Sequence, residues 1–193
     1  MPGCKKAVFL DRDGTIIEER GYIKNPEEIV FFPDVISALR VLQERFLLFI
    51  ITNQSGVGEG YITIDDVEQV NYIVLEVLRK EGVRIEKIYY CPHIKTDRCK
   101  CRKPEPYYIY KASEEYGLDI SKSFTIGDHP CDVEMAIKSG ATGIFVLTGH
   151  GRKHLLEIPP SVMVVENISE AIRYIMEIDG LRTVKGILDK YIV

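Results

Sequence analysis

Short apolar runs separated by longer stretches of helical period restrict what this chain can fold into more than any other feature. Apolar runs without alternation are typical of strands that are buried on both faces of a parallel sheet. They lie at Ala7 to Leu10, Leu47 to Ile51, Ile85 to Tyr90, Phe124 to Ile126 and Thr142 to Leu147, with a last strand expected near Val162 to Val165. The pattern predicts an α/β fold in which helices cover both faces of a parallel sheet.

Two of the intervening helices have clear signatures. Apolar residues at helical spacing after Pro33 predict the first of them, namely Val35, Leu39, Leu42 and Phe46. For the second, Thr63 and Asp66 resemble a capping box, and Gly82 is a natural stop. Its expected apolar face consists of Ile64, Val67, Val70, Val74, Val77 and Leu78.

Length, composition and charge limit the classes of protein to which this chain can belong. A chain of 193 residues with 46% hydrophobic and 28% charged residues suits one globular domain, which we expect to span residues 1–193. The net charge of −4 and the scattered Lys and Arg residues argue against a nucleic-acid partner. The apolar run after the N-terminus is too short for a signal peptide or a membrane span, so we expect a cytoplasmic protein without a membrane partner.

Polar clusters follow three of the predicted strands. Asp11-Arg12-Asp13-Gly14-Thr15 follows the first, Thr52-Asn53-Gln54-Ser55-Gly56 the second, and Gly127-Asp128-His129-Pro130-Cys131-Asp132 the fourth. Ligands of parallel sheets bind at the carboxyl ends of the strands, so these clusters are expected at one site. Arg102 and Lys103 precede another helix and add positive charge there. The segment Thr148 to Arg152 follows the fifth strand and is either part of the rim or an exposed turn.

This combination has the parts that phosphoryl transfer requires. It offers a carboxylate nucleophile, a second carboxylate for proton transfer, metal ligands, a hydroxyl and a cation. Any one of these motifs alone is often only a solvated turn, but all of them occur in order at strand ends. A receiver domain of a signalling system combines similar groups, yet its Lys follows a late strand, whereas Lys103 comes before a helix.

Three of the five cysteines gather with a histidine between residues 91 and 101, which favours metal ligation by reduced thiols over disulfides. The ligands Cys91, His93, Cys99 and Cys101 suit a tetrahedral structural zinc ion, with none left for an open catalytic position. The alternative is a chance grouping of thiols with a surface histidine. Bound zinc would pin this loop, residues 91–101, and present Arg102 and Lys103 to a phosphate.

The chain resembles the haloacid dehalogenase-like phosphatase superfamily. Its four motifs are matched by Asp11-x-Asp13-Gly14-Thr15, by Thr52, by Lys103, and by Asp128 with Asp132. The resemblance implies a Rossmann-like sheet without a large cap domain. It makes Asp11 the nucleophile and Asp13 the general acid and base, with Thr52 and Lys103 on the phosphoryl oxygens. Mg²⁺ would be held by the Asp11 carboxylate, the Asp13 carbonyl and Asp128.

The zinc loop narrows the resemblance to the subgroup of the D-glycero-D-manno-heptose 1,7-bisphosphate 7-phosphatases and histidinol-phosphatases. Gly21-Tyr22, Thr52 to Gly56 and Ile88 to His93 resemble the heptose enzymes, whereas the short loop between His93 and Cys99 resembles the histidinol enzymes. The main implied function is hydrolysis of the C7 phosphate of the heptose bisphosphate. The alternatives are hydrolysis of histidinol phosphate and an inactive zinc-stabilised binding module.

The same resemblance implies which residues meet the substrate, a small phosphorylated sugar. A flap of about residues 14–33 would contact the sugar, and loop residues would line the pocket. The implied contacts are Glu19, Arg20, Gly21, Tyr22, Asn53, Gln54, Ser55, Arg102 and His129. His129 departs from the Lys that heptose enzymes carry there, and its alternative role is to start the helix before Pro130. We expect a monomer.

Overall fold

The computed structural model describes residues 5–191, and for residues 181–191 the backbone alone. Cys4, which the sequence leaves outside the predicted metal cluster, lies outside the described residues.

All the predicted strands form, and they join in one parallel sheet of six strands with the order β3-β2-β1-β4-β5-β6. The predicted bounds agree with those observed to within two residues. The strands are β1 (Ala7–Leu10), β2 (Leu47–Asn53), β3 (Lys87–Cys91), β4 (Phe124–Gly127), β5 (Thr142–Val146) and β6 (Met163–Val165). Every residue of β1 and β4 is buried, which is why both read as continuous apolar runs.

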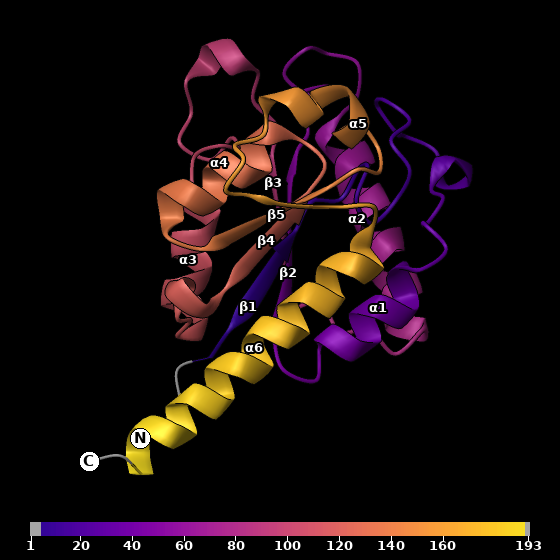
Figure 1. Cartoon of the computed structure of the whole chain (residues 1–193). Helices are drawn as coiled ribbons and strands as arrows, with labels where there is room; N and C mark the ends of the chain where they lie inside the picture. The colour runs from indigo at the N-terminus through magenta and orange to yellow at the C-terminus, as the bar shows by residue number, and fades with distance from the viewer. Residues whose placement is uncertain (1–4, 192–193) are drawn as a thin grey trace.

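Helices lie on both faces of the sheet, as predicted (Figure 1). Three of them share one apolar cluster with the sheet: α1 (Val35–Leu42), α2 (Ile64–Lys80) and α6 (Ile168–Tyr191). Two pack on the opposite face: α3 (Tyr107–Tyr116) and α4 (Pro130–Ser139). Shorter helical segments are α5 (Gly151–His154), η1 (Pro26–Glu28), η2 (Lys95–Asp97), η3 (Ile120–Lys122) and η4 (Leu155–Glu157).

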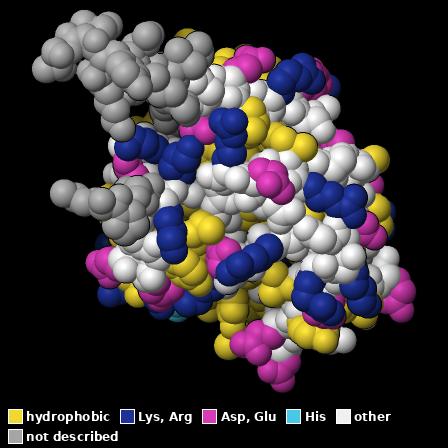
Figure 2. Space-filling model, turned by 90° about the horizontal axis from the view of Figure 1, so that it is seen from below, with side chains coloured by type: hydrophobic (Ala, Val, Ile, Leu, Met, Phe, Trp, Pro, Cys, Tyr) yellow, Lys and Arg dark blue, Asp and Glu magenta, His cyan; other side chains and the backbone are white. Residues whose placement is uncertain are grey.

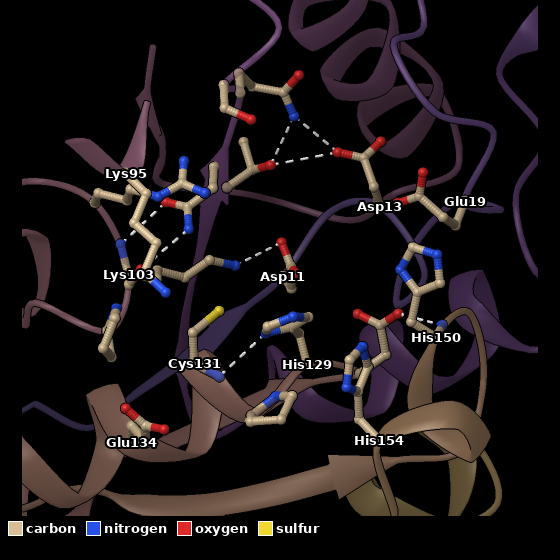
Figure 3. Close-up of a pocket in the computed structure, with 18 of the residues that line it drawn as sticks. Asp11, Asp13, Glu19, Lys95, Lys103, His129, Cys131, Glu134, His150 and His154 are labelled. Carbon is tan, nitrogen blue, oxygen red and sulfur yellow. Dashed lines mark hydrogen bonds and ion pairs between the residues drawn. The ribbon is translucent and has the colours of Figure 1, made fainter. Parts of the chain in front are cut away.

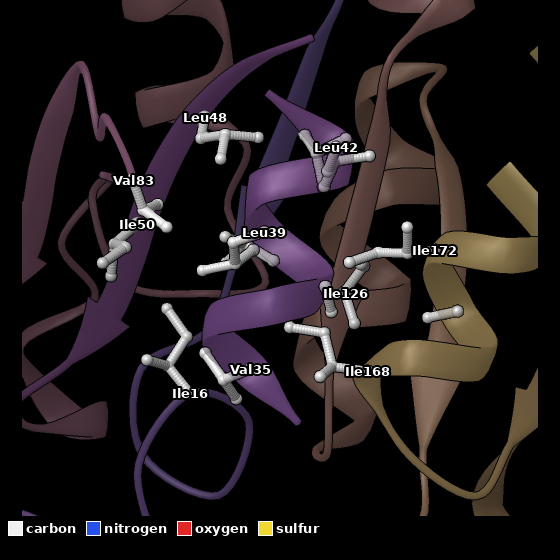
Figure 4. Close-up of a cluster of buried hydrophobic side chains, with 14 of the residues drawn as sticks. Ile16, Val35, Leu39, Leu42, Leu48, Ile50, Val83, Ile126, Ile168 and Ile172 are labelled. Atoms are coloured by element: carbon white, nitrogen blue, oxygen red, sulfur yellow. The ribbon is translucent and has the colours of Figure 1, made fainter. Parts of the chain in front are cut away.

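The larger cluster fixes the strands whose ends carry the polar residues. In Figure 4, Leu39 and Leu42 of α1 lie between Leu48 and Ile50 of β2 on one side and Ile172 of α6 on the other. Each fully buried Leu or Ile stabilises the fold by about 1.5–3 kcal/mol. The ends of β1, β2 and β4 are therefore set by a rigid core.

Two details of the helices differ from the sequence prediction. Ile64 is 47% exposed, because it occupies the first position of α2 and turns away from the face that begins at Val67. Helix α1 ends at Leu42, so Phe46 is not helical, although it is buried edge-on against Phe124 at 5.7 Å. The capping box of Thr63 and Asp66 is present as predicted.

Two segments project from the sheet layer, namely residues 14–33 and the loop that follows β3. The first is anchored by the buried side chains of Ile16, Ile17 and Ile23. No large cap unit occurs among residues 5–191, in agreement with the prediction, while the organisation of residues 1–193 as one domain stays a prediction. Lys and Arg side chains alternate with acidic ones on the face in Figure 2. None of the described helices has the length and apolar character required to span a bilayer.

Candidate active site

The polar clusters meet at the carboxyl ends of the strands, around a cavity of about 1170 Å³ (Figure 3). Most of the predicted site residues line it: Asp11, Asp13, Glu19, Gly21, Tyr22, Thr52, Asn53, Gln54, Ser55, Arg102, Lys103, Asp128 and His129. Arg20 does not, because its guanidinium pairs with Glu18 at 2.7 Å on the exposed side of the segment. The cavity is much larger than one phosphate group, so it has room for the rest of a substrate.

Three carboxylates lie together: Asp11 and Asp128 line the cavity, and Asp132 is buried beside them. Oxygen atoms of Asp11, Asp128 and Asp132 all lie within 4.8 Å of one another. Burial raises the pKa of Asp11 to about 7, although attraction to Lys103 opposes the shift. Burial, followed by repulsion from Asp11 and Asp132, raises the pKa of Asp128 to about 8. Three carboxylates held this close need positive charge beside them.

Lys103 supplies part of that charge from an almost completely buried position at the cavity. Its Nζ lies 2.8 Å from Asp11 and 2.7 Å from Asp132, and it donates to the Ile51 carbonyl at 2.9 Å. Burial disfavours the ammonium form, but the attraction of Asp11 and Asp132 outweighs it, and the pKa of Lys103 is raised. Lys103 provides one positive charge for three carboxyl groups, so a metal ion bound beside them would balance further negative charge.

The donors fit a hard cation. Carboxylate and carbonyl oxygens are the ligands that Mg²⁺ prefers, and Asp11 and Asp128 present carboxylates on the cavity side. Gly14 allows the Asp128 carboxylate to lie close to the backbone that follows β1. Its φ is +78°, and a Cβ at this position would lie 2.1 Å from Asp128 Oδ2. The Asp-x-Asp-Gly pattern therefore has a steric reason in this fold.

Asp13 lies on the other side of the cavity from α4. Its carboxylate accepts hydrogen bonds from Gln54 Nε2 at 2.8 Å and from Thr52 Oγ1 at 3.3 Å, and it pairs with Arg12 at 2.9 Å. Gln54 is 6% exposed and also donates to Thr52 at 2.8 Å, so its amide is directed at these two side chains. Sequence reasoning missed Arg12.

The four predicted soft ligands come together in the loop after β3. The Sγ atoms of Cys91, Cys99 and Cys101 lie 3.4–3.5 Å from one another, and His93 Nδ1 lies 3.3 Å from Cys101 Sγ. A zinc ion bonded to sulfur at about 2.3 Å in a tetrahedron separates its sulfur ligands by roughly 3.8 Å. The cluster, already near that spacing, fits a tetrahedral metal ion.

This loop is tied to the active site through Arg102, Lys103 and Asn53. Arg102 Nη1 donates to the His93 carbonyl at 2.9 Å. The Asn53 side chain at the end of β2 exchanges two hydrogen bonds with the Lys103 backbone, at 3.0 and 3.2 Å. The metal loop and β2 therefore hold Lys103 in place together.

The segment of residues 14–33 contacts the loop after β2 at the mouth of the cavity. The ring of Tyr22 stacks on Tyr61 with centroids 5.0 Å apart, and its hydroxyl donates to Glu59 at 2.5 Å. A Cβ at Gly56 would lie 2.5 Å from the Tyr22 ring, so only glycine leaves room for this contact. Glu19 accepts from the backbone N–H of Gly21 at 2.7 Å.

The turn after β5, Thr148 to Arg152, is part of the cavity rim and not merely an exposed turn, because His150 lines the cavity. The backbone N–H of His150 donates to Asp128 Oδ2 at 2.7 Å. His129 starts α4, accepting from the Cys131 N–H at 3.3 Å, and also lines the cavity, 4.7 Å from the His154 ring. Sequence reasoning missed His154, because no motif marks it and only the fold brings α5 to α4.

Comparison with known proteins agrees with this geometry. A family model described as HAD-hydrolase-like matches residues 100–171. The chain is 36% identical to a Helicobacter pylori protein named D-glycero-beta-D-manno-heptose-1,7-bisphosphate 7-phosphatase, over 91% of this chain and 99% of that protein. The chain belongs to the haloacid dehalogenase-like phosphatase superfamily. Within this superfamily, the predicted subgroup is confirmed as well.

Two further relatives of this haloacid dehalogenase-like protein support the assignment. A Thermoplasma volcanium protein named as a probable D-glycero-D-manno-heptose-1,7-bisphosphate 7-phosphatase is 40% identical, over 64% of this chain and 85% of that protein. The crystal structure of the D,D-heptose 1,7-bisphosphate phosphatase of B. bronchiseptica, complexed with magnesium and phosphate, has a TM-score of 0.82. It is 28% identical, and the match covers 89% of this chain and 98% of that one.

Proposed function

We propose that this protein is a phosphatase that removes the C7 phosphate of D-glycero-D-manno-heptose 1,7-bisphosphate through a phosphorylated Asp11. One observation carries the proposal: the Asp11 carboxylate lies 2.8 Å from the buried ammonium of Lys103, at the floor of a cavity with room for a sugar. The names of the relatives supply the substrate.

In the first step, a carboxylate oxygen of Asp11 attacks phosphorus and the bond to the sugar oxygen breaks. Lys103 and the Thr52 hydroxyl stabilise charge on the phosphoryl oxygens, and Asp13 gives its proton to the leaving oxygen. The products of this step are the sugar alcohol and an aspartyl phosphate. An acyl phosphate hydrolyses far more easily than the original ester, so one slow step becomes two faster ones.

In the second step, Asp13 takes a proton from water, and the water oxygen attacks the phosphorus of the aspartyl phosphate. Inorganic phosphate leaves, and Asp11 returns to its carboxylate form. The same side chain of Asp13 thus acts first as an acid and then as a base.

Asp11 and Asp128, with the Asp13 carbonyl, would hold Mg²⁺. Bound there, the ion neutralises charge so that an anionic carboxylate can approach an anionic phosphate. Asp132 has a different role, because its carboxylate is 2% exposed and pairs with Lys103 at 2.7 Å. It holds the ammonium in place.

The substrate is expected to enter with its primary C7 ester towards Asp11. Four cationic side chains that suit a second phosphate line the cavity: Lys95, Arg98 and Arg102 from the loop after β3, and Lys153 from α5. The second phosphate would then supply binding energy for the reaction at the first one. Some relatives are named for the beta anomer of the bisphosphate and others for the alpha anomer, so kcat/KM should be measured for both anomers.

The substrate proposal predicts that kcat/KM is highest for a heptose 1,7-bisphosphate. We expect lower values for the heptose 7-monophosphate and for histidinol phosphate, because neither supplies a second phosphate to these cations. Phosphorus NMR of the product should show that the anomeric phosphate remains. A preference for histidinol phosphate, or a product that keeps its C7 phosphate, would contradict the substrate. No phosphate release from any ester would favour the inactive binding module.

The metal loop is proposed to hold one structural Zn²⁺ through Cys91, His93, Cys99 and Cys101. We predict that Cys99→Ser lowers the zinc content of the purified protein well below one per chain and lowers its melting temperature. Loss of a ligand weakens a site whose binding free energy is also folding free energy. Metal analysis and thermal unfolding measure the two effects.

Cys131→Ser is the matched control for this variant, because Cys131 is also a free cysteine but is not part of the metal cluster. It should keep a full zinc complement. If Cys99→Ser also keeps its zinc and its melting temperature, the cluster is not a structural zinc site. Zinc should resist mild EDTA, whereas Mg²⁺ at the open carboxylate site should be removed readily.

Three broader properties complete the proposal. The protein acts as a monomer, residues 1–193 form one phosphatase domain, and residues 14–33 form the substrate flap. A reducing compartment such as the cytoplasm suits a metal loop whose three thiols must remain reduced.

A further inference from the structure

One charged side chain beside Asp13 has no role in the proposed mechanism although it is almost entirely buried. Arg12 is 1% exposed. A guanidinium removed from water is unfavourable unless its donors are paired, so its partners define what it does.

Most of the donors of Arg12 are directed at Asp13. Nη2 lies 2.9 Å from Oδ2 and 3.1 Å from Oδ1, while Nε lies 3.1 and 3.2 Å from the same two oxygens. Two nitrogens facing two oxygens form the planar fork that gives an arginine–carboxylate pair its fixed geometry.

The remaining nitrogen ties this fork to the fold. Arg12 Nη1 donates to Asn71 Oδ1 at 2.7 Å. Asn71 belongs to α2 and is buried, with 7% of its surface exposed. On the other side of the carboxylate, the Gln54 amide donates to Asp13 at 2.8 Å. The Asp13 side chain is therefore held from α2 and from the loop after β2.

Asp13 nevertheless remains open to the substrate. Its side chain is 12% exposed, and it lines the cavity shown in Figure 3. Arg12 thus lies behind the carboxylate, between it and α2, and leaves one edge accessible.

We propose that Arg12, anchored by Asn71, is a positioning residue that fixes the orientation of the Asp13 carboxylate for proton transfer. This inference rests on the proposed function, in which Asp13 protonates the leaving oxygen and later accepts a proton from water. Proton transfer requires the acid to lie within hydrogen-bond reach of the leaving oxygen, so a carboxylate free to rotate is a poor acid.

The choice of leaving group separates this role from a general contribution to folding. A sugar alkoxide is a poor leaving group and needs the proton, whereas p-nitrophenolate leaves with little help. Disturbing the orientation of Asp13 should therefore lower kcat/KM for the sugar ester much more than kcat/KM for p-nitrophenyl phosphate. This constant reports formation of the aspartyl phosphate, whereas the later attack by water needs Asp13 equally for both substrates.

The test uses the full-length protein with Arg12→Lys and Asn71→Leu. Arg12→Lys keeps a positive charge but loses the fork and the link to Asn71, and Asn71→Leu removes only the link. We expect kcat/KM for the heptose bisphosphate to fall by roughly 10²-fold in Arg12→Lys, and in the same direction but less in Asn71→Leu. With p-nitrophenyl phosphate the fall should stay below about tenfold.

Ser123→Ala is the matched control for the loss of a buried hydrogen bond. Ser123 is 0% exposed, donates to the Asp119 carbonyl at 2.7 Å and precedes β4 at the end of the sheet away from the cavity. This variant should change the ratio between the two substrates little, even if it lowers the melting temperature.

Equal loss on both substrates in Arg12→Lys and Asn71→Leu would overturn the positioning role, because it would show a structural effect alone. Unchanged activity on both would overturn it too. Failure of the proposed function looks different, since the wild-type protein itself would then release no phosphate from the heptose bisphosphate.

Discussion

Asp11→Asn is expected to lower phosphatase activity by roughly 10⁵-fold or more, the size of effect seen when the nucleophile of a covalent mechanism is removed. The amide keeps the shape of the side chain but cannot attack phosphorus. It also removes a negative charge that would balance bound Mg²⁺. Phosphate release from the heptose bisphosphate and from p-nitrophenyl phosphate should both be lost, because both reactions need the same nucleophile.

The fold should survive this substitution. The variant loses the ion pair between Asp11 and Lys103, but it also loses the repulsion from Asp11 that contributes to the raised pKa of Asp128. Asp65→Asn, at an exposed position in the first turn of α2, is the isosteric control and should keep full activity. Substantial turnover by folded Asp11→Asn would contradict the nucleophile assignment.

Lys103→Met is expected to reduce both activity and stability strongly. The methionine keeps most of the aliphatic stem but leaves the buried Asp132 without its partner at 2.7 Å. Removing one member of a buried ion pair costs about 3–5 kcal/mol. For a chain of this size that corresponds to a fall in melting temperature of roughly 6–20 °C. Phosphate release should become hard to detect, since the phosphoryl group loses its cation.

Lys138→Met is the control for the loss of a lysine from an ion pair. Lys138 lies 2.7 Å from Glu105, but both side chains are more than 40% exposed. Such surface pairs contribute about 0–1 kcal/mol, so stability and activity should change little. If Lys103→Met unfolds at the wild-type temperature and retains most of its activity, the proposed role of Lys103 is wrong.

The strand-end residues were predictable from the sequence because of how parallel sheets bury their strands. Both faces of β1 and β4 are covered, so these strands appear as continuous apolar runs, and the first polar residue after each marks the edge of the sheet. Asp11 and Asp128 are such residues. The metal loop was predictable for another reason, since its ligands are close in sequence and their spacing alone reveals them.

Contacts between distant segments could not be predicted in this way. Arg12 looks like an ordinary surface residue, and only the placement of α2 puts Asn71 beside it, 59 positions along the chain. His154 came to the cavity because α5 folds back towards the start of α4. Arg20 was expected near the substrate, but Glu18 at 2.7 Å holds its side chain elsewhere.

Covalent trapping of the phosphoryl group tests the central claim most directly. In Asp13→Asn the nucleophile is intact but water is no longer activated, so the aspartyl phosphate should accumulate when the ester has a good leaving group. Mixing this variant with p-nitrophenyl phosphate and Mg²⁺ should release a burst of p-nitrophenol that matches the enzyme concentration. Mass spectrometry after an acid quench should find an equal amount of phosphoryl group on Asp11. Steady release of p-nitrophenol with no phosphorylated enzyme, or a phosphoryl group on any other residue, would contradict Asp11 as the nucleophile.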